Sequence, residues 1–173
     1  MGRRFVVIGT TGSGKTTLSR KLAGRLGVPH VELDALHWGP GWEEPGVEVF
    51  RGRVREAVSG DAWVVDGNYS EVRDLVWGRA DTVVWLDFPL RVIMRRLVPR
   101  SLKRVALRER LWGTNTETLT SLLGRDSIVL FALKSHGRQR RNYPGLLRGI
   151  EGAEVVHLTS QEQVDGWLSL VKA

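Results

Sequence analysis

Eight residues near the start of the chain have the types and spacing of a loop that binds phosphate. Residues 9–16 read Gly-Thr-Thr-Gly-Ser-Gly-Lys-Thr and match the pattern G-x-x-x-x-G-K-[ST]. The glycines let the backbone curl so that successive N–H groups point at phosphate oxygens. We expect Lys15 to contact the β- and γ-phosphates of a nucleoside triphosphate and the Thr16 hydroxyl to ligate Mg²⁺. The residues predicted to bind the nucleotide are Thr11, Gly12, Ser13, Gly14, Lys15, Thr16 and Thr17.

The segments on either side of this loop distinguish it from an ordinary glycine-rich turn. Residues 5–8 (Phe-Val-Val-Ile) are entirely apolar, as expected for a strand buried on both faces of a sheet. Residues 15–26 carry apolar side chains at helical spacing. Strand, glycine loop and helix in this order are the context that the motif requires, and the helix adds its positive N-terminal end. The sequence therefore predicts binding of a nucleoside triphosphate.

The rest of the chain alternates short apolar runs with helical patterns. We expect a further helix from Asn115 or Thr116 to Leu123, and Pro144-Gly145 predicts a turn. Strands separated by helical crossovers form a parallel sheet with helices on both faces, so the predicted fold class is α/β. The other expected strands are residues 31–34, 63–66, 82–87 and 154–158, and the other expected helices are residues 47–58, 89–98, 128–134 and 160–171.

Three carboxylates close predicted strands, namely Asp34, Asp66 and Asp87. Ligands of open α/β sheets bind at the carboxyl ends of the strands, which is also where the phosphate loop lies. We therefore expect these side chains to share one edge of the sheet with Lys15. Asp87 is set aside as a ligand because an aspartate just before a helix more often caps that helix.

Length and composition favour a compact protein of one domain, residues 1–173, with enough mass for a buried core. No run of the sequence approaches the roughly 18 apolar residues of a membrane span. The first residues do not have the pattern of a signal peptide or of a myristoylation site. The lack of cysteine excludes disulfides and thiolate metal sites, and the four scattered histidines do not suggest zinc. We expect a cytoplasmic protein that does not bind membranes.

The net charge of +7 is concentrated in the second half of the chain. Residues 91–141 contain 13 Lys and Arg side chains and only three acidic ones. This asymmetry predicts a polyanionic partner, either nucleotide phosphates or nucleic acid, with a solvated basic surface as the alternative. We expect Arg100 and Arg104 to close over the ATP phosphates and to act in catalysis. They belong to a series at every fourth position, which Pro99 interrupts: Arg96, Arg100, Arg104 and Arg108.

Two stretches further along resemble a known group of P-loop proteins. Residues 34–38 read Asp-Ala-Leu-His-Trp, with Gly-Trp at 41–42, and residues 66–69 read Asp-Gly-Asn-Tyr. Together with the phosphate loop, they resemble the adenylate-kinase-like proteins often labelled topology modulation proteins. That group belongs to the superfamily of nucleoside monophosphate, shikimate and gluconate kinases. Looser matches follow at Arg96, Arg100, 109–112, Asn115, Glu117 and 126–128. Position 116 departs from the pattern, because it is Thr where that group has Arg.

The resemblance implies a single-domain P-loop fold with five parallel strands in the order 2-3-1-4-5 and helices on both faces. Residues 35–60 would form the acceptor-binding segment and residues 99–114 an arginine-rich lid. Asp34 would bind or deprotonate an acceptor hydroxyl, unless it only caps a helix. Asp66 would orient Mg²⁺ through water, unless it only forms an Asp-Gly turn. The metal residues are then Thr16 and Asp66, and the catalytic residues are Lys15, Asp34, Arg100 and Arg104.

Side chains around these carboxylates suggest an apolar-walled acceptor pocket. Trp38 and Trp42 either stack on a ring of the acceptor or anchor their loop to the core. A phosphate acceptor would need arginines, for which Arg51, Arg53 and Arg55 are available. The predicted acceptor-binding residues are Asp34, His37, Trp38, Trp42, Asn68 and Tyr69.

These features predict a phosphotransferase that moves the γ-phosphoryl group of MgATP to a small-molecule or nucleotide acceptor. ATP is favoured over GTP because the sequence has no Asn-Lys-x-Asp motif for guanine. Asp34 and the aromatic loop favour a hydroxyl acceptor, whereas the resemblance to adenylate kinase favours a nucleoside monophosphate. Two other functions stay open: a P-loop protein that binds or modifies nucleic acid through residues 91–141, and a nucleotide-dependent regulatory switch with negligible transfer.

Overall fold

The architecture is a parallel β-sheet between two layers of helices. The structure is a computed structural model, and it describes residues 2–113, 115–118, 124 and 127–172. The central sheet has five strands, all parallel to their neighbours. In spatial order they are β2 (His30–Glu32), β3 (Trp63–Asp66), β1 (Arg4–Gly9), β4 (Thr82–Leu86) and β7 (Glu154–Leu158). Since β7 is the fifth strand of this sheet along the chain, the predicted order 2-3-1-4-5 and the α/β class are confirmed.

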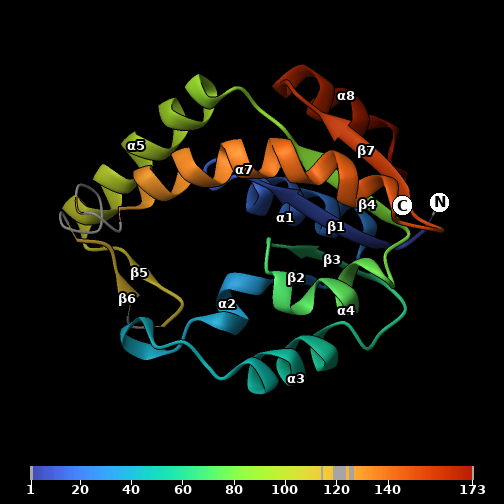
Figure 1. Cartoon of the computed structure of the whole chain (residues 1–173), viewed down its shortest axis with the longest axis horizontal. Helices are drawn as coiled ribbons and strands as arrows, with labels where there is room; N and C mark the ends of the chain where they lie inside the picture. Colours follow the sequence, from blue (N-terminus) through green and yellow to red (C-terminus); the bar gives the residue numbers. More distant parts are fainter. Residues whose placement is uncertain (1, 114, 119–123, 125–126, 173) are drawn as a thin grey trace.

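Helices cover both faces of the sheet (Figure 1). One layer packs on the face that includes Val6 and Ile8, and the other on the face that includes Phe5 and Val7. Successive side chains of β1 thus enter opposite cores, which explains why the strand is apolar throughout. The first layer is α3 (Val47–Ala57), α4 (Arg73–Trp77) and α7 (Ile128–Arg148); the second is α1 (Lys15–Leu26), α5 (Leu90–Leu107) and α8 (Gln161–Leu170).

Short elements join these layers beside the carboxyl ends of the strands. The antiparallel hairpin of β5 and β6 follows α5 and reaches toward the segment between α2 and α3 (Figure 1). In the described part of the chain, no helix is both long and apolar enough to cross a membrane. The short elements are α2 (Leu33–His37), η1 (Pro40–Trp42), η2 (Ser70–Val72), β5 (Arg110–Leu111) and β6 (Asn115–Thr116).

The surroundings of Asp34 differ from the sequence prediction. A strand is present here as predicted, but its predicted end at residue 34 is wrong, because β2 ends at Glu32 and Asp34 lies inside helix α2. The apolar pattern misled because Leu33 is buried in the core whether it belongs to a strand or to a helix. The N-cap of α2 is Glu32, so Asp34 is not a capping residue and its carboxylate is left for another role.

Helix α7 is much longer than the sequence prediction. Ser127 caps it by accepting a hydrogen bond from the Leu130 N–H, as its position suggested, but the helix then continues through Pro144. The turn predicted at Pro144-Gly145 is therefore wrong, as is an end near residue 134. Tyr143 and Leu147 are buried against the sheet, and this packing holds the last turns of α7 in place despite the proline.

The basic segment before α7 also differs from the prediction. α5 continues through Pro99 to Leu107 instead of ending just before the proline. Asn115 and Thr116 form strand β6 rather than the start of a helix, because the Asn115 amide bonds to another loop and does not cap its own segment. The rest of that expected helix, residues 119–123, lies outside the described residues.

Replacing Pro144 with alanine tests this account of α7. Proline in a helix interior costs about 3 kcal/mol relative to alanine, and part of this cost remains in a helix that has adapted to it. We expect Pro144→Ala to raise the free energy of unfolding by about 1–2 kcal/mol in urea titrations. Pro45→Ala, in the loop before α3, is the matched control and should leave that free energy unchanged or slightly lower. A less stable Pro144→Ala protein would contradict the account.

Candidate functional site

The phosphate loop, residues 9–16, joins β1 to α1 in a conformation that requires glycine. Gly9, Gly12 and Gly14 have φ values of 145°, 84° and 96°. A Cβ atom on Gly9 would lie 2.5 Å from the Leu86 carbonyl oxygen, so no larger residue fits. Gly14 caps α1 without a side-chain hydrogen bond, which leaves the first N–H groups of the helix to an anion or to water. The loop therefore fits a polyphosphate.

The side chains of the loop divide into buried and accessible ones. Ser13 is buried, and its hydroxyl has no hydrogen-bond partner among the described residues. The side chain of Thr17 is exposed, and Thr11 and Thr16 are partly buried. The Thr10 hydroxyl donates to Gln139 of α7 at 3.0 Å, which ties the loop to the opposite helix layer. The Ser13 hydroxyl, in contrast, is free to donate to a ligand.

Lys15 is held at the centre of the site. Its Nζ atom donates to the Thr10 carbonyl at 3.3 Å. Burial lowers the pKa of the Lys15 amine, and the charge on Arg100 lowers it further, while the carboxylates of Asp34 and Asp66 oppose this shift. These carboxylates and the guanidinium are thus within electrostatic reach of one ammonium group. A bound phosphate would restore the interactions that Lys15 lost with water.

Thr16 and Asp66, the two predicted metal residues, are brought together. The Thr16 hydroxyl lies 3.5 Å from Asp66 Oδ1, at the outer limit of a hydrogen bond. His30 Nε2 lies 2.9 Å from the other oxygen, Oδ2. Asp66 ends β3 and is 2% exposed. This buried carboxylate therefore has one oxygen held by an imidazole and the other directed at the phosphate loop.

Glu32 is a carboxylate of the site that the sequence analysis missed. It ends β2 directly beside Asp66 in the strand register. Burial raises the pKa of its carboxyl, and so do the negative charges of Asp66 and Asp34, while a hydrogen bond from Trp112 opposes them. The sequence prediction placed Glu32 inside a strand that ended at Asp34, and only the observed end of β2 brings Glu32 to this edge of the sheet.

The residues present fit a magnesium ion that accompanies a nucleotide. The described residues include no group of three or more His, Asp or Glu side chains arranged to hold a metal by themselves. Mg²⁺ usually binds proteins through one or two side chains and takes its remaining ligands from phosphate and water. The Thr16 hydroxyl and the Asp66 carboxylate would hold it in this way, and bound magnesium would neutralise phosphate charge.

Asp34 carries a hydrogen bond that fixes its carboxylate. The Tyr69 hydroxyl donates to Asp34 Oδ1 at 2.7 Å. Burial raises the pKa of the Tyr69 hydroxyl, and the charge of Asp34 raises it further, so the phenol stays a donor. Tyr69 follows β3 in the segment that contains Asn68, whose amide bonds twice to the backbone of Gly9. Asn68 thus links the end of β3 to the phosphate loop, and Tyr69 links it to Asp34.

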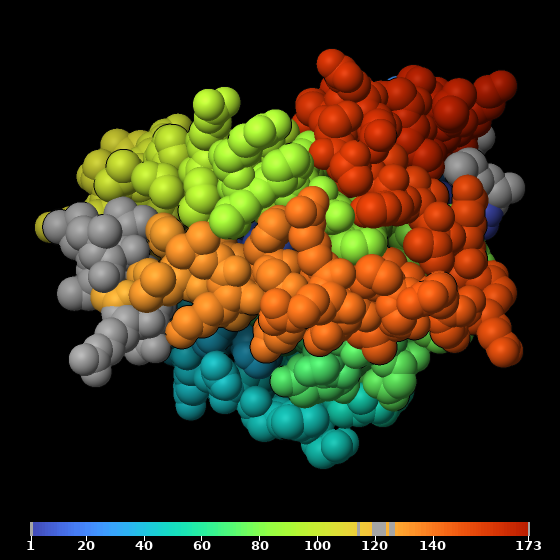
Figure 2. All heavy atoms as spheres, turned by 45° about the horizontal axis from the view of Figure 1, so that its top comes forward, coloured from blue at the N-terminus to red at the C-terminus, as the bar shows by residue number. Residues whose placement is uncertain are grey.

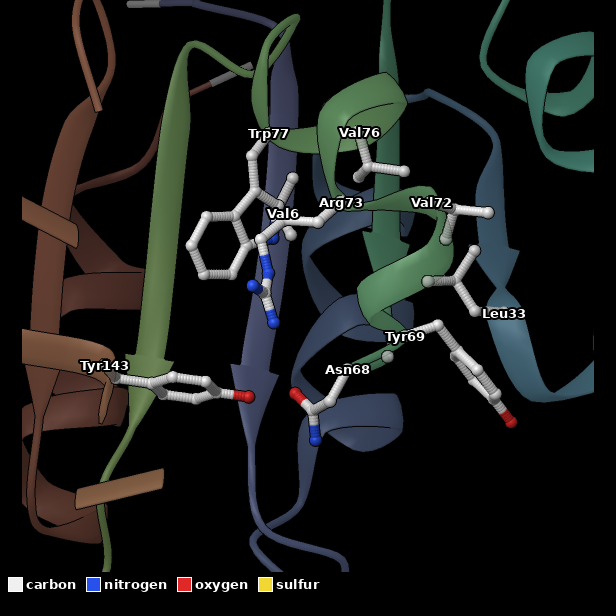
Figure 3. Close-up of a pocket in the computed structure, with 10 residues that line it drawn as sticks. Val6, Leu33, Asn68, Tyr69, Val72, Arg73, Val76, Trp77 and Tyr143 are labelled. Atoms are coloured by element: carbon white, nitrogen blue, oxygen red, sulfur yellow. The ribbon is translucent and has the colours of Figure 1, made fainter. Parts of the chain in front are cut away.

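A small cavity behind Asn68 and Tyr69 is too narrow for an acceptor. It lies between the sheet, α4 and α7 and has a volume of about 10 Å³, enough for one water-sized sphere. Figure 3 shows the Tyr69 hydroxyl pointing away from Val6 and Tyr143, which line the cavity. The Tyr69 hydroxyl is directed instead to Asp34, on the other side of the ring.

The predicted aromatic residues form one continuous row of rings. His37 lies 4.6 Å from Tyr69 and 4.8 Å from Trp38, measured between ring centroids. Trp42 continues the row, 5.5 Å from Trp38 and 5.8 Å from Trp112. Trp112, which was not among the predicted acceptor-binding residues, completes it. The buried Nδ1 atom of His37 has no hydrogen-bond partner among the described residues. The row therefore forms a wall that runs from Tyr69, beside Asp34, to Trp112 in the hairpin.

Asn115 fastens the hairpin to the loop that carries Trp42. Its Oδ1 atom accepts from the Trp42 N–H, and its Nδ2 group donates to the Gly39 carbonyl, both at 2.9 Å. The Trp42 indole donates in turn to the Thr116 carbonyl at 3.3 Å. Asn115 is 2% exposed. Trp112 of this hairpin belongs to the expected lid (residues 99–114) and Trp42 to the expected acceptor segment (residues 35–60), so their ring contact joins the two segments directly.

The two predicted catalytic arginines have different surroundings. Arg104 is paired with Glu117 at 2.9 Å and approaches Glu109 at 3.7 Å. Arg100 makes no ion pair with any described residue, and its buried Nε has no hydrogen-bond partner among them. Burial lowers the pKa of Arg100, and the charge of Arg104 lowers it further. The charges of Glu117 and Asp34 oppose this shift, and a guanidinium that forms no ion pair with a described residue is a group that an anion would stabilise.

Comparisons with known proteins agree with this geometry. No family model and no curated protein sequence matches the chain. Among solved structures, it is similar to the shikimate kinase of Bacteroides thetaiotaomicron, at 17% identity over 98% of this chain and 96% of that chain, with a TM-score of 0.57. The chain has the fold of a P-loop kinase.

Two further structures support the same conclusion. One is the shikimate kinase of Acinetobacter baumannii in complex with shikimate (17% identity, 98% of this chain and 90% of that chain, TM-score 0.58). The other is a sugar kinase of Janibacter sp. HTCC2649 (20% identity, 98% of this chain and 94% of that chain, TM-score 0.50). Both are named as kinases, and the similarity over nearly the whole of each chain confirms the expected fold.

The lowered pKa of Lys15 has a consequence for stability. Between that lowered pKa and the ordinary value of 10.5, the unfolded chain binds a proton that the folded chain does not. The buried charge therefore destabilises the fold below this window, and the penalty is lost as the pH rises through it. Lys15→Met should raise the free energy of unfolding at pH 7, measured with urea, by about 1–2 kcal/mol. The same variant should remove the rise in stability at alkaline pH.

Lys21→Met is the matched control, because Lys21 lies on the exposed side of the same helix. It should change neither the stability at pH 7 nor its dependence on pH. A Lys15→Met protein that is no more stable than the wild type would contradict a cost of burying this ammonium group.

Proposed function

We propose that the protein is a MgATP-dependent kinase that phosphorylates a hydroxyl group of a small molecule. The observation that carries the proposal is the Asp34 carboxylate, which Tyr69 holds at 2.7 Å within electrostatic reach of Lys15 of the phosphate loop. A carboxylate beside a bound triphosphate would repel a second phosphate but would accept a hydroxyl proton. The similarity to small-molecule kinases supports this proposal at the level of the fold.

The arginines of α3 support a hydroxyl acceptor over a nucleoside monophosphate. Arg51 donates to both carboxylate oxygens of Asp74, at 2.7 and 2.8 Å, and this pairing lowers the pKa of Asp74 to about 2. Arg53 donates to the Leu36 carbonyl at 2.9 Å, and Arg55 is exposed. A phosphate acceptor needs a guanidinium that is free to bind it. Two of the three candidates are already engaged by the protein.

The proposed chemistry assigns one task to each charged group. Asp34 Oδ2, the oxygen that does not accept from Tyr69, takes the hydroxyl proton as the acceptor oxygen forms its bond to the γ-phosphorus. The bond from that phosphorus to the bridging oxygen breaks, and the negative charge leaves with ADP. Lys15 and Arg100 stabilise the charge on the phosphoryl oxygens during this transfer. Residues 99–114 would act as the lid and residues 35–60 as the acceptor segment.

The basic segment gives weaker support to nucleic-acid binding. α5 and α7 lie side by side on one face of the molecule (Figure 2), but part of their charge is used inside the protein. Arg104 pairs with Glu117, and Arg140 pairs with Asp87. The open groove on α7 includes one aromatic ring, that of Phe131, whereas surfaces for single strands usually stack several bases. Binding of DNA that persists at about 0.1 M salt would favour this alternative.

The direct test is ADP release in the presence of MgATP and a panel of acceptors. Sugars, polyols and hydroxy acids should include an acceptor that stimulates release, and nucleoside monophosphates should not. Stimulation by nucleoside monophosphates alone would contradict the assignment of Asp34. Nucleotide binding without release in any mixture would favour the regulatory switch.

Variants of the Asp34 pair give the second test. Asp34→Asn should lower kcat by about 100- to 10,000-fold, because it removes the proton acceptor. Tyr69→Phe should lower kcat by about tenfold or more, because it removes a hydrogen bond to a charged group. Calorimetry should show ADP affinity unchanged in both variants. An Asp34→Asn enzyme with full turnover would contradict the proposal.

Arg100, which forms no ion pair with a described residue, gives a third test. Arg100→Ala should lower kcat by about 100-fold or more while changing ATP affinity far less, because it acts on charge that develops during transfer. Arg104→Ala should have a smaller effect, since Glu117 already neutralises that side chain. Arg95→Ala, exposed on the same helix, is the control and should leave kcat unchanged. Unchanged turnover in Arg100→Ala would exclude this role.

A further inference from the structure

We propose that His30 is a positioning residue that orients the Asp66 carboxylate for the magnesium ion of a bound nucleotide. The inference rests on one part of the proposed function, the binding of a Mg²⁺–nucleotide complex. It does not depend on an acceptor. It assigns a role to a histidine that the sequence analysis considered only when it dismissed a zinc site.

The geometry divides the two oxygens of Asp66 between two partners. His30 Nε2 lies 2.9 Å from Oδ2, and the Thr16 hydroxyl lies 3.5 Å from Oδ1. The side chain of Asp66 is 2% exposed and that of His30 is 18% exposed. With Oδ2 bound by an imidazole N–H, the carboxylate keeps Oδ1 directed at the phosphate loop. The contact thus selects one rotation of the carboxylate group.

The backbone on both sides of this contact is fixed. His30 begins β2 and lies opposite Val64 in the parallel register with β3. Gly67, which follows Asp66, has a φ of 140°, and a Cβ atom there would lie 2.7 Å from the Leu33 Cβ. Asp66 itself is paired with Val7 of β1 and with Glu32 of β2, so neighbouring strands hold its backbone on both sides. The remaining freedom is rotation of the side chain, which is the motion that His30 restrains.

A donor at this point also offsets a local excess of negative charge. Glu32 lies beside Asp66 in the register, and Asp34 is close enough for its charge to affect Glu32. Without a donor on Oδ2, repulsion from these carboxylates would favour a rotation of Asp66 away from them. A metal ligand whose other oxygen is hydrogen-bonded is held in place in this way in many metal sites.

A second histidine–aspartate pair provides a matched comparison within the chain. His157 Nε2 lies 3.1 Å from Asp87 Oδ2, and its ring stacks on Trp85 with centroids 4.2 Å apart. Asp87 is also held by Arg140, at 2.6 Å. This pair joins β7, α7 and the end of β4. It has the same chemistry as the pair of His30 but contacts neither Thr16 nor the phosphate loop in any described interaction.

The experiment compares ADP affinity with Mg²⁺ and with EDTA by calorimetry. His30→Leu should weaken ADP binding in Mg²⁺ by about 10- to 100-fold, the usual effect of losing a residue that orients a metal ligand. Its affinity in EDTA should stay within about twofold of the wild type, because the phosphate loop is unchanged. His30→Gln, whose amide reaches the position of Nε2, should restore most of the Mg²⁺-dependent affinity. His157→Leu should match the wild type in both solutions.

Several results would overturn the inference. Equal losses in Mg²⁺ and in EDTA would show a structural role, and no loss in either would show no role. A His30→Gln protein as impaired as His30→Leu would exclude the hydrogen bond as the cause. If His30→Leu does not fold, His30→Asn replaces it, since its amide is too short to reach Oδ2 and it should show the same selective loss.

Failure of the proposed function gives a different result. A wild-type protein that binds ADP more tightly with Mg²⁺ but phosphorylates no acceptor would contradict the kinase and leave this inference intact. A wild-type protein that binds no nucleotide would remove the basis of both. Loss of the Mg²⁺ effect in His30→Leu, within an active kinase, is the result that supports both.

Discussion

The structure depends on placing an ammonium group and three carboxylates close together at a partly buried edge of the sheet. Parallel strands make this possible, because β1, β2 and β3 all end at the same edge of the sheet. Lys15 alone cannot balance Glu32, Asp34 and Asp66, and each carboxylate has a donor of its own. Trp112, Tyr69 and His30 supply these donors. The surrounding loops are therefore arranged to satisfy charge before any ligand binds.

Much of this edge could be predicted from local sequence. The phosphate loop depends on glycines, a lysine and a threonine whose spacing is fixed by the ligand, and the strand order followed from a resemblance carried by a few motifs. Glu32 and His30 were missed because their roles come from lateral pairing of β2 with β3, which brings residues 36 apart in sequence within 2.9 Å. Cross-strand register of this kind has no signature in a single strand.

The helices show where prediction from local sequence fails. Local rules end a helix at proline, and α5 and α7 both continue through one, because their flanking turns pack against the rest of the protein. The hairpin was missed for a related reason. Its strands are two residues each, and they persist because Asn115 binds a loop about 75 positions earlier. Tertiary contacts decided the structure at each of these points.

The two amide contacts of Asn115 also set an energy scale for access to the site. With the bond from the Trp42 indole to Thr116, three hydrogen bonds worth roughly 1.5–4.5 kcal/mol in total join the hairpin to this loop, so an arrangement with the hairpin lifted would account for at most about one molecule in ten. An acceptor that enters between these loops would then bind to this minor arrangement and would not have to force the loops apart.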